Sequence, residues 1–193
     1  MYLGEDWTSR QLRKTLTEEY PYLLPRTMTS DEVHPDYDYQ YINGEYDLPE
    51  GWMQLFLQCC KDIKEPLEKV GYLNKFRFLQ IKEKWGRMEL YCHGATDEVL
   101  RIIDKYRFLS QQVCSICGKP ANVMTYGYVC PYCNRCVMDS DMYVDEAEII
   151  EIKTSYTQDT FGIDGHKEEF VDCKDEWGRY LDRIGYVTTE TVC

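Results

Sequence analysis

Cysteine is the residue type that points most clearly to chemistry in this sequence. Five of the ten cysteines lie between residues 114 and 136, and Cys114–Cys117 and Cys130–Cys133 form two CxxC pairs separated by 12 residues. A CxxC turn places two thiolates on one side of a tight loop, and two such turns supply the tetrahedral shell of four sulfurs that zinc prefers. We therefore predict zinc as the cofactor, with Cys114, Cys117, Cys130 and Cys133 as ligands and Cys136 as a spare ligand.

Two other cysteine chemistries fit parts of this pattern. A redox-active CxxC pair is expected at the start of a helix within a thioredoxin-like βαβ unit, which the surrounding sequence does not suggest. An iron–sulfur cluster could use Cys130, Cys133 and Cys136 together with Cys114 or Cys117. Because a closed shell of four thiolates leaves no open coordination position, we expect the metal to stabilise the fold rather than to catalyse a reaction.

The other reactive residue types form no recognisable catalytic set. The histidines are His34, His93 and His166, and none belongs to a recognisable nucleophile arrangement. The sequence contains no P-loop, GxSxG, HExxH or GxGxxG motif. We predict that the chain is not an enzyme, and an enzyme of unrecognised type stays open as an alternative.

Charge is distributed unevenly along the chain, whose 193 residues carry a net charge of −12. Residues 27–51 hold seven acids and no Lys or Arg, and residues 139–193 hold 15 acids and five bases, whereas residues 52–138 have a net charge of +5. This balance is unfavourable for binding a polyanion as a whole. The two acidic segments are either ordinary solvated surface or a face that attracts a basic partner.

Acidic and aromatic side chains alternate within the acidic segments, where tyrosine offers contact area at low entropic cost. The residues that we expect to bind a partner protein are Asp36, Tyr37, Asp38, Tyr39, Asp139, Asp141, Asp145 and Glu146. Their partner would be a protein with a basic surface, because spaced carboxylates can imitate phosphates.

The basic central segment supports a different function. A zinc ribbon that binds nucleic acid would use basic side chains on or near a predicted hairpin as phosphate contacts, namely Arg77, Lys82, Lys84 and Arg87. Lysines on a hairpin also protect sheet edges against aggregation, so this pattern alone does not establish nucleic-acid binding.

Hydrophobic periodicity predicts the elements that position these residues. The expected elements are helices over about 10–20, 51–70, 97–112 and 167–184, a hairpin over 76–92 and a short strand over 126–129. In the hairpin, Leu79, Ile81 and Trp85 are expected to face the core. No run of about 18 apolar residues and no secretory signal is visible, so we expect a soluble, cytoplasmic protein.

These elements predict an α+β fold in which helices pack on a small antiparallel hairpin or sheet, with a four-cysteine zinc knuckle or ribbon. The domain organisation that we expect is an N-terminal helix and acidic Tyr-rich loop (1–50), an α+β core with the zinc knuckle (51–138) and an acidic C-terminal extension with an amphipathic helix (139–193).

Several motifs occur in an order that resembles a known family. They are Tyr20-Pro21, Gly51-Trp52, the run Gln80-Ile81-Lys82-Glu83-Lys84-Trp85-Gly86, and Cys114-x-x-Cys117-Gly118. Over residues 11–138 the chain resembles a family of small uncharacterised proteins found mainly in bacteriophages, prophages and bacterial genomes. The resemblance implies a zinc-containing phage or prophage accessory protein in a bacterial host cell, without an established reaction. With no catalytic set, we expect it to act by protein binding, as an inhibitor of a bacterial defence nuclease of the anti-CRISPR type.

Overall fold

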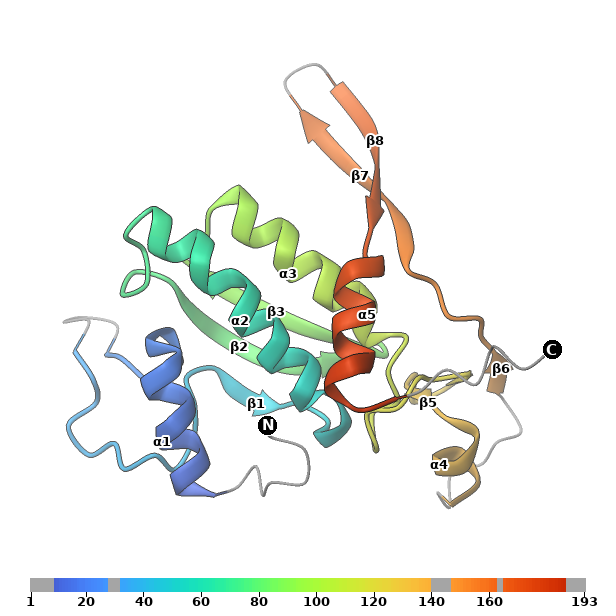
Figure 1. The fold of residues 1–193 in the computed structure, drawn as a ribbon, viewed down its shortest axis with the longest axis horizontal. Helices are drawn as coiled ribbons and strands as arrows, with labels where there is room; N and C mark the ends of the chain where they lie inside the picture. The colour runs from blue at the N-terminus through green and yellow to red at the C-terminus, as the bar shows by residue number, and fades with distance from the viewer. Residues whose placement is uncertain (1–8, 28–31, 140–146, 163–164, 187–193) are drawn as a thin grey trace.

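Residues 9–27, 32–139, 147–162 and 165–186 are described by a computed structural model, which shows an α+β fold (Figure 1). The predicted fold class is therefore confirmed. The helices are α1 (Arg10–Glu19), α2 (Met53–Lys69), α3 (Asp97–Ser110), α4 (Asn134–Asp139) and α5 (Lys174–Arg183). The strands are β1 (Glu45–Asp47), β2 (Arg77–Lys84), β3 (Arg87–His93), β4 (Val123–Thr125), β5 (Pro131–Tyr132), β6 (Ala147–Ile149), β7 (Ser155–Gly162) and β8 (Gly165–Asp172).

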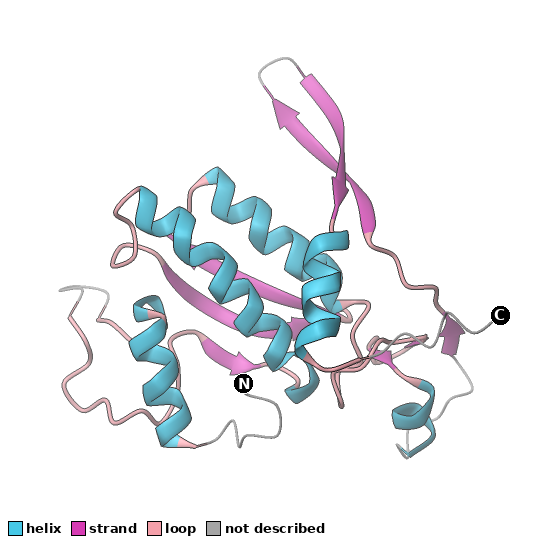
Figure 2. Ribbon diagram, in the orientation of Figure 1, coloured by secondary structure: helices cyan, strands magenta, loops and turns pink. Residues whose placement is uncertain are grey.

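The central sheet has the order β1–β2–β3, and α2 and α3 lie side by side across it (Figure 2). β2 and β3 form the predicted antiparallel hairpin, with Ile81 opposite Leu90. β1 pairs with β2 in parallel, from a segment in which the sequence suggests mainly loop. Ile81 and Leu90 are buried beneath the helices, so the hairpin supplies the floor of the main core.

A β-bulge changes which hairpin residues face this core. The register of β2 shifts between Phe78 and Gln80, so Phe78 and Ile81 are both buried and Leu79 is exposed. Trp85 lies in the turn between the strands and is also exposed. The prediction that Leu79 and Trp85 face the core is therefore wrong, and the prediction for Ile81 is confirmed.

The first three helices lie close to their predicted positions. α1 buries Leu12 and Leu16, and α3 is capped by Thr96, whose hydroxyl accepts a hydrogen bond from the Val99 amide. α2 continues through Pro66 to Lys69, although proline cannot donate the amide hydrogen bond that a residue inside a helix normally makes to the carbonyl four residues earlier. None of the described helices is long and apolar enough to span a lipid bilayer.

The C-terminal region differs from the predicted single helix over 167–184. Its first half is β8, which pairs with β7 in a hairpin that projects away from the helices (Figure 1). Its second half is α5. Trp177 and Tyr180 of this helix, and Cys173 just before it, are buried in the same core as α2 and the central sheet. The C-terminal helix is thus docked on the body of the protein, and the β7–β8 hairpin is held out from it.

Candidate metal centre

Four cysteine thiols converge at one point in the structure. The sulfur atoms of Cys114, Cys117, Cys133 and Cys136 all lie within 4.8 Å of one another, and the Sγ atoms of Cys117 and Cys133 are 3.6 Å apart. Sulfurs bound tetrahedrally to one zinc ion at about 2.3 Å would be about 3.8 Å apart. The cluster therefore has the size and the donor set needed to hold a metal ion.

This ligand set differs from the predicted one by a single residue. Cys130 is not part of the cluster, and the residue expected to be a spare, Cys136, takes the fourth position. Cys130 is 2% exposed and packs in a small core with Val123 and Tyr132. Its amide donates to the Thr125 hydroxyl over 3.1 Å, which keeps this residue within the β4–β5 turn.

The first pair of ligands lies on a tight knuckle. The Gly118 amide donates to the Cys114 carbonyl over 3.0 Å, and the Cys114 amide donates to the Lys119 carbonyl over 2.8 Å. Gly118 has a φ of +72°, a conformation that side chains disfavour, so glycine suits the curl of the backbone around the sulfurs. These contacts fix Cys114 and Cys117 on the same side of the loop.

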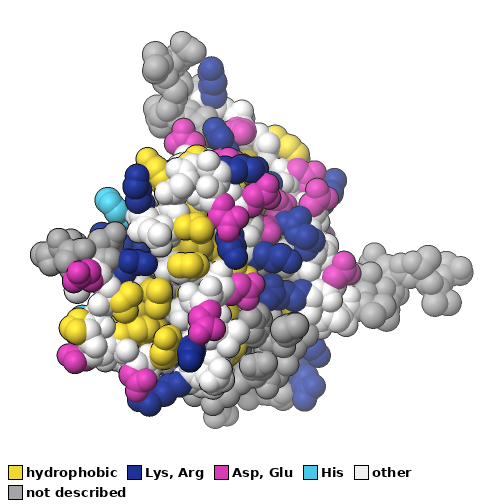
Figure 3. All heavy atoms as spheres, turned by 60° about the vertical axis from the view of Figure 1, so that its left-hand side comes forward, with side chains coloured by type: hydrophobic (Ala, Val, Ile, Leu, Met, Phe, Trp, Pro, Cys, Tyr) yellow, Lys and Arg dark blue, Asp and Glu magenta, His cyan; other side chains and the backbone are white. Residues whose placement is uncertain are grey.

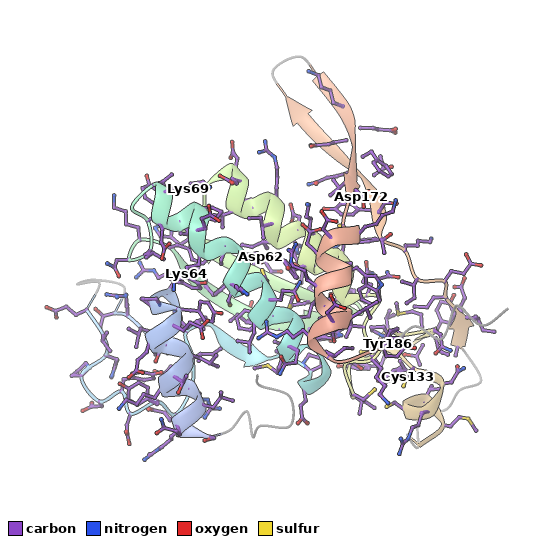
Figure 4. The ribbon with its side chains drawn as sticks, viewed as in Figure 1. Asp62, Lys64, Lys69, Cys133, Asp172 and Tyr186 are labelled. Atoms are coloured by element: carbon purple, nitrogen blue, oxygen red, sulfur yellow. The ribbon has the colours of Figure 1, made fainter. Side chains whose placement is uncertain are left out.

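The second pair is positioned by a hairpin and a short helix. β4 pairs with β5 antiparallel, Cys133 follows β5 directly, and Cys136 lies in the first turn of α4 (Figure 4). The strand expected over 126–129 lies a few residues earlier, because Gly127 has a φ of +82° in the turn. The Ser115 amide donates to the Pro131 carbonyl over 2.9 Å and joins the two ligand pairs.

The thiols of the cluster differ in acidity. Burial raises the pKa of the Cys117 and Cys136 thiols. Burial also opposes ionisation of Cys133, but the hydrogen bonds from Cys136, Cys117 and Cys114 together outweigh burial and lower the pKa of Cys133. A bound cation would stabilise all four thiolates, so metal binding at this cluster must release protons.

The knuckle is locked to the main core by close backbone contacts. A methyl group on Gly51 would lie 2.2 Å from the Cys114 carbonyl oxygen, so only glycine fits at this position. The Trp52 indole donates to the Val113 carbonyl over 2.8 Å, and the Tyr180 hydroxyl of α5 donates to the Gly118 carbonyl. The start of α2, the knuckle and α5 therefore form one packed unit.

The predicted acidic and aromatic residues are only partly described. Tyr37 is the centre of a small ring cluster, with centroids 5.1 Å from Tyr39 and 5.7 Å from Tyr41. Asp36 is exposed, and Asp38 forms a 2.8 Å ion pair with Arg10. Of the second predicted group, Asp139 is the last residue of α4, and Asp141, Asp145 and Glu146 lie outside the described residues.

The predicted basic residues do lie on the hairpin. Lys84 pairs in register with Arg87 next to the turn, while Lys82 and Arg77 lie further along β2. Arg87 bonds Glu89 over 2.6 Å, and the buried carboxylate of Glu89 also accepts from Arg107 of α3. On the face drawn in Figure 3, basic and acidic side chains are interspersed rather than gathered into a field of one sign.

Sequence reasoning missed the role of Cys136 as a full ligand, although a signal was present. Cys133-Asn134-Arg135-Cys136 is itself a CxxC motif that overlaps the one formed by Cys130 and Cys133. Spacing could not decide between the two, because the choice depends on where the β4–β5 turn ends and α4 begins.

Comparisons with known proteins add no relative to this picture: no family model, no curated protein and no solved structure matches the chain. The resemblance to a family of phage and prophage proteins therefore stays a prediction. What the geometry supports directly is a four-cysteine cluster able to hold a metal ion.

Proposed function

We propose that this protein works by binding a partner protein, and that its four-cysteine site holds zinc that stabilises the binding scaffold. The observation that carries the proposal is the β7–β8 hairpin, residues 155–172, which we call the arm. The arm projects from the body and is a two-stranded sheet, with no third strand among the described residues (Figure 1). Two-stranded hairpins are marginally stable alone, and unpaired strand edges are ready to accept another chain.

The chemistry of the arm favours a basic partner. Its sequence holds five acids and one lysine, so the acidic excess of the C-terminal region includes the arm, while α5 has three acids and three bases. Asp159 is paired with Glu168 in the register of the two strands. Phe170 is 69% exposed and would give the contact an apolar anchor.

The base of the arm is held firmly enough to present these groups. The Cys173 amide donates to the Thr154 carbonyl over 2.7 Å and clamps the two ends of the arm together. The ring of Tyr156 stacks on Phe108 of α3 at 4.6 Å, and Lys105 forms a 2.9 Å ion pair with Glu176 of α5. A partner would therefore meet an arm that is already oriented at its root.

The partner that we propose is a nucleic-acid enzyme of a bacterial defence system, whose basic channel would accept carboxylates in place of phosphates. The protein would then act as an inhibitor without catalysing a reaction. The acidic residues of the arm supply the phosphate-like charge, and the exposed aromatic ring supplies contact area. The Tyr37 cluster is a second acidic and aromatic surface that could widen the interface.

The test is a pull-down with the full, zinc-loaded chain from nuclease-treated bacterial lysate. The arm variant Phe170→Ala/Glu168→Lys is compared with the variant Val70→Ala/Glu65→Lys at the C-terminal end of α2, which also truncates one exposed apolar side chain and reverses one exposed acid. We expect the wild-type chain and the control variant to capture a protein in stoichiometric amount and the arm variant to lose it. Because salt screens charges, the binding should weaken when the salt concentration is raised about tenfold, from roughly 50 to roughly 500 mM. A captured protein that is insensitive to the arm variant, or no capture at all, would refute the proposal.

A further inference from the structure

Two exposed loops that contact each other each carry a large aromatic side chain. Trp85, in the β2–β3 turn, is 72% exposed, and Tyr128, between β4 and β5, is 59% exposed. The loops touch, because a methyl group on Gly86 would lie 3.1 Å from the Val129 side chain. We call this surface, made of Trp85, Tyr128 and the adjacent Lys84 and Arg87, the turn surface.

One carboxylate holds the two loops in place. Glu83 accepts a 2.8 Å hydrogen bond from the Gly86 amide through Oε1, and its Oε2 accepts a 3.2 Å hydrogen bond from the Tyr128 hydroxyl. Glu83 is opposite Met88, on the other side of the strand from Lys82 and Lys84. Glu83 therefore preorganises the turn surface from the face of the strand opposite Lys84.

The backbone of Trp85 is in a conformation that this residue disfavours. Trp85 and Gly86 have φ values of +56° and +74°, as in a type I′ turn, whose first position favours asparagine. A bulky residue with positive φ is an outlier that costs conformational stability. Packing does not repay this cost, because most of the indole is in solvent.

The charges beside the turn also favour an anionic ligand. Lys84 and Arg87 are directly opposite each other at the end of the hairpin. Arg87 is already paired with the buried Glu89 over 2.6 Å, whereas Lys84 has no acidic partner among the described residues. Lys82 lies two residues away on the same side of β2. An anion at Lys84 would supply the counter-charge that Glu89 gives to Arg87.

We infer that the turn surface binds single-stranded nucleic acid, with bases stacked on Trp85 and Tyr128 and phosphates contacted by Lys84 and Arg87. Stacking on aromatic side chains contributes about 1–3 kcal/mol per base and tolerates any sequence. The net charge of −12 does not prevent such binding, because distant acids are screened beyond about 8 Å at physiological salt. The binding is separate from that of the arm, which lies on other strands.

The experiment measures fluorescence anisotropy of labelled ten-nucleotide dT and rU strands with the full, zinc-loaded chain at 50 mM salt. Trp85→Asn is the main variant, because asparagine favours the turn and so keeps the fold while removing the stacking ring. We expect it to weaken binding about 10-fold or more, and Tyr91→Ala, an exposed aromatic of β3, to leave binding unchanged.

A second pair of variants tests the phosphate contacts. Lys84→Glu should weaken binding and reduce the slope of log K against log salt by about 0.7 or more, whereas Lys69→Glu on α2 should change neither. Circular dichroism and zinc content check that each variant is folded. No binding at 100 μM protein, equal losses with Trp85→Asn and Tyr91→Ala, or equal affinity for a duplex would each overturn the inference. Arm variants should leave this binding intact, so its failure and that of the proposed function are distinguishable.

Discussion

The metal centre allows a prediction with a matched control, because Cys133 is shared by two CxxC motifs. Cys136→Ala removes a thiol of the observed cluster, and Cys130→Ala removes the thiol that spacing alone favours. If the cluster is the metal site, the first variant should lose zinc and the second should retain it. Both substitutions remove one sulfur, so the comparison isolates its position.

The expected magnitudes differ clearly between the two variants. Loss of an outer-shell partner alone weakens metal binding 10–100-fold, so loss of the Cys136 thiolate should weaken it more than about 100-fold. At fixed free zinc this corresponds to more than about 2.7 kcal/mol of the unfolding free energy, or about 5–11 °C in Tm. Cys130→Ala removes one buried heavy atom and should cost about 0.5–1.5 kcal/mol.

Zinc content by inductively coupled plasma mass spectrometry and thermal melts with and without chelator measure both effects. Wild type and Cys130→Ala should carry one equivalent of zinc, and the Tm of both should fall when chelator is added. Cys136→Ala should carry far less zinc, and chelator should not change its Tm. The reverse pattern, with zinc lost from Cys130→Ala and kept by Cys136→Ala, would refute the ligand assignment.

Three further outcomes follow from the packing around the knuckle. Gly51→Ala should destabilise the fold by at least about 3 kcal/mol in urea unfolding, because its methyl group would lie 2.2 Å from the Cys114 carbonyl oxygen; a change below 1 kcal/mol would contradict this. Tyr180→Phe should lower the urea midpoint by the equivalent of about 1–3 kcal/mol at constant m, since it leaves the Gly118 carbonyl without its donor. Burial raises the pKa of Cys173 to about 12, whereas an unfolded thiol ionises near 8.5, so this thiol makes the unfolding free energy fall by up to about 1.4 kcal/mol per pH unit above about pH 8.5. Cys173→Ala should flatten that slope in melts between pH 8 and 10, and an unchanged slope would exclude this cause.

The sequence was sufficient to predict an element where the hydrophobic pattern of that element alone determines its position. The position of α3 follows from helical periodicity, and the β2–β3 hairpin follows from two alternating runs of residues. The bulge in β2 was not predictable from alternation, because only the packing of Phe78 and Ile81 against the same helices reveals it. A single slipped residue was enough to turn Leu79 outward.

The C-terminal region shows a second limit. Phe170, Cys173 and Trp177 have helical spacing, yet Phe170 belongs to a strand and only the later two are buried against the core. Residues with helical spacing can belong to two different elements when the chain changes direction between them. Here the change occurs at Cys173, between β8 and α5. The pairing of β8 with β7 depends on contacts between two segments, and the spacing of hydrophobic residues within one segment does not reveal it.

The connection between the metal centre and the arm gives the cluster a role in binding as well as stability. Tyr180 of α5 donates to Gly118 of the knuckle, and α5 follows directly from the clamp between Cys173 and Thr154 at the root of the arm. Between Cys173 and Tyr180 the chain makes only two turns of helix, so a knuckle that opens without metal removes one of the contacts that seat α5. The arm would keep its own strand pairing and the Tyr156–Phe108 stack at its root, but its orientation would be less firmly fixed. Metal removal should therefore weaken partner binding even though none of the four cysteines belongs to the arm.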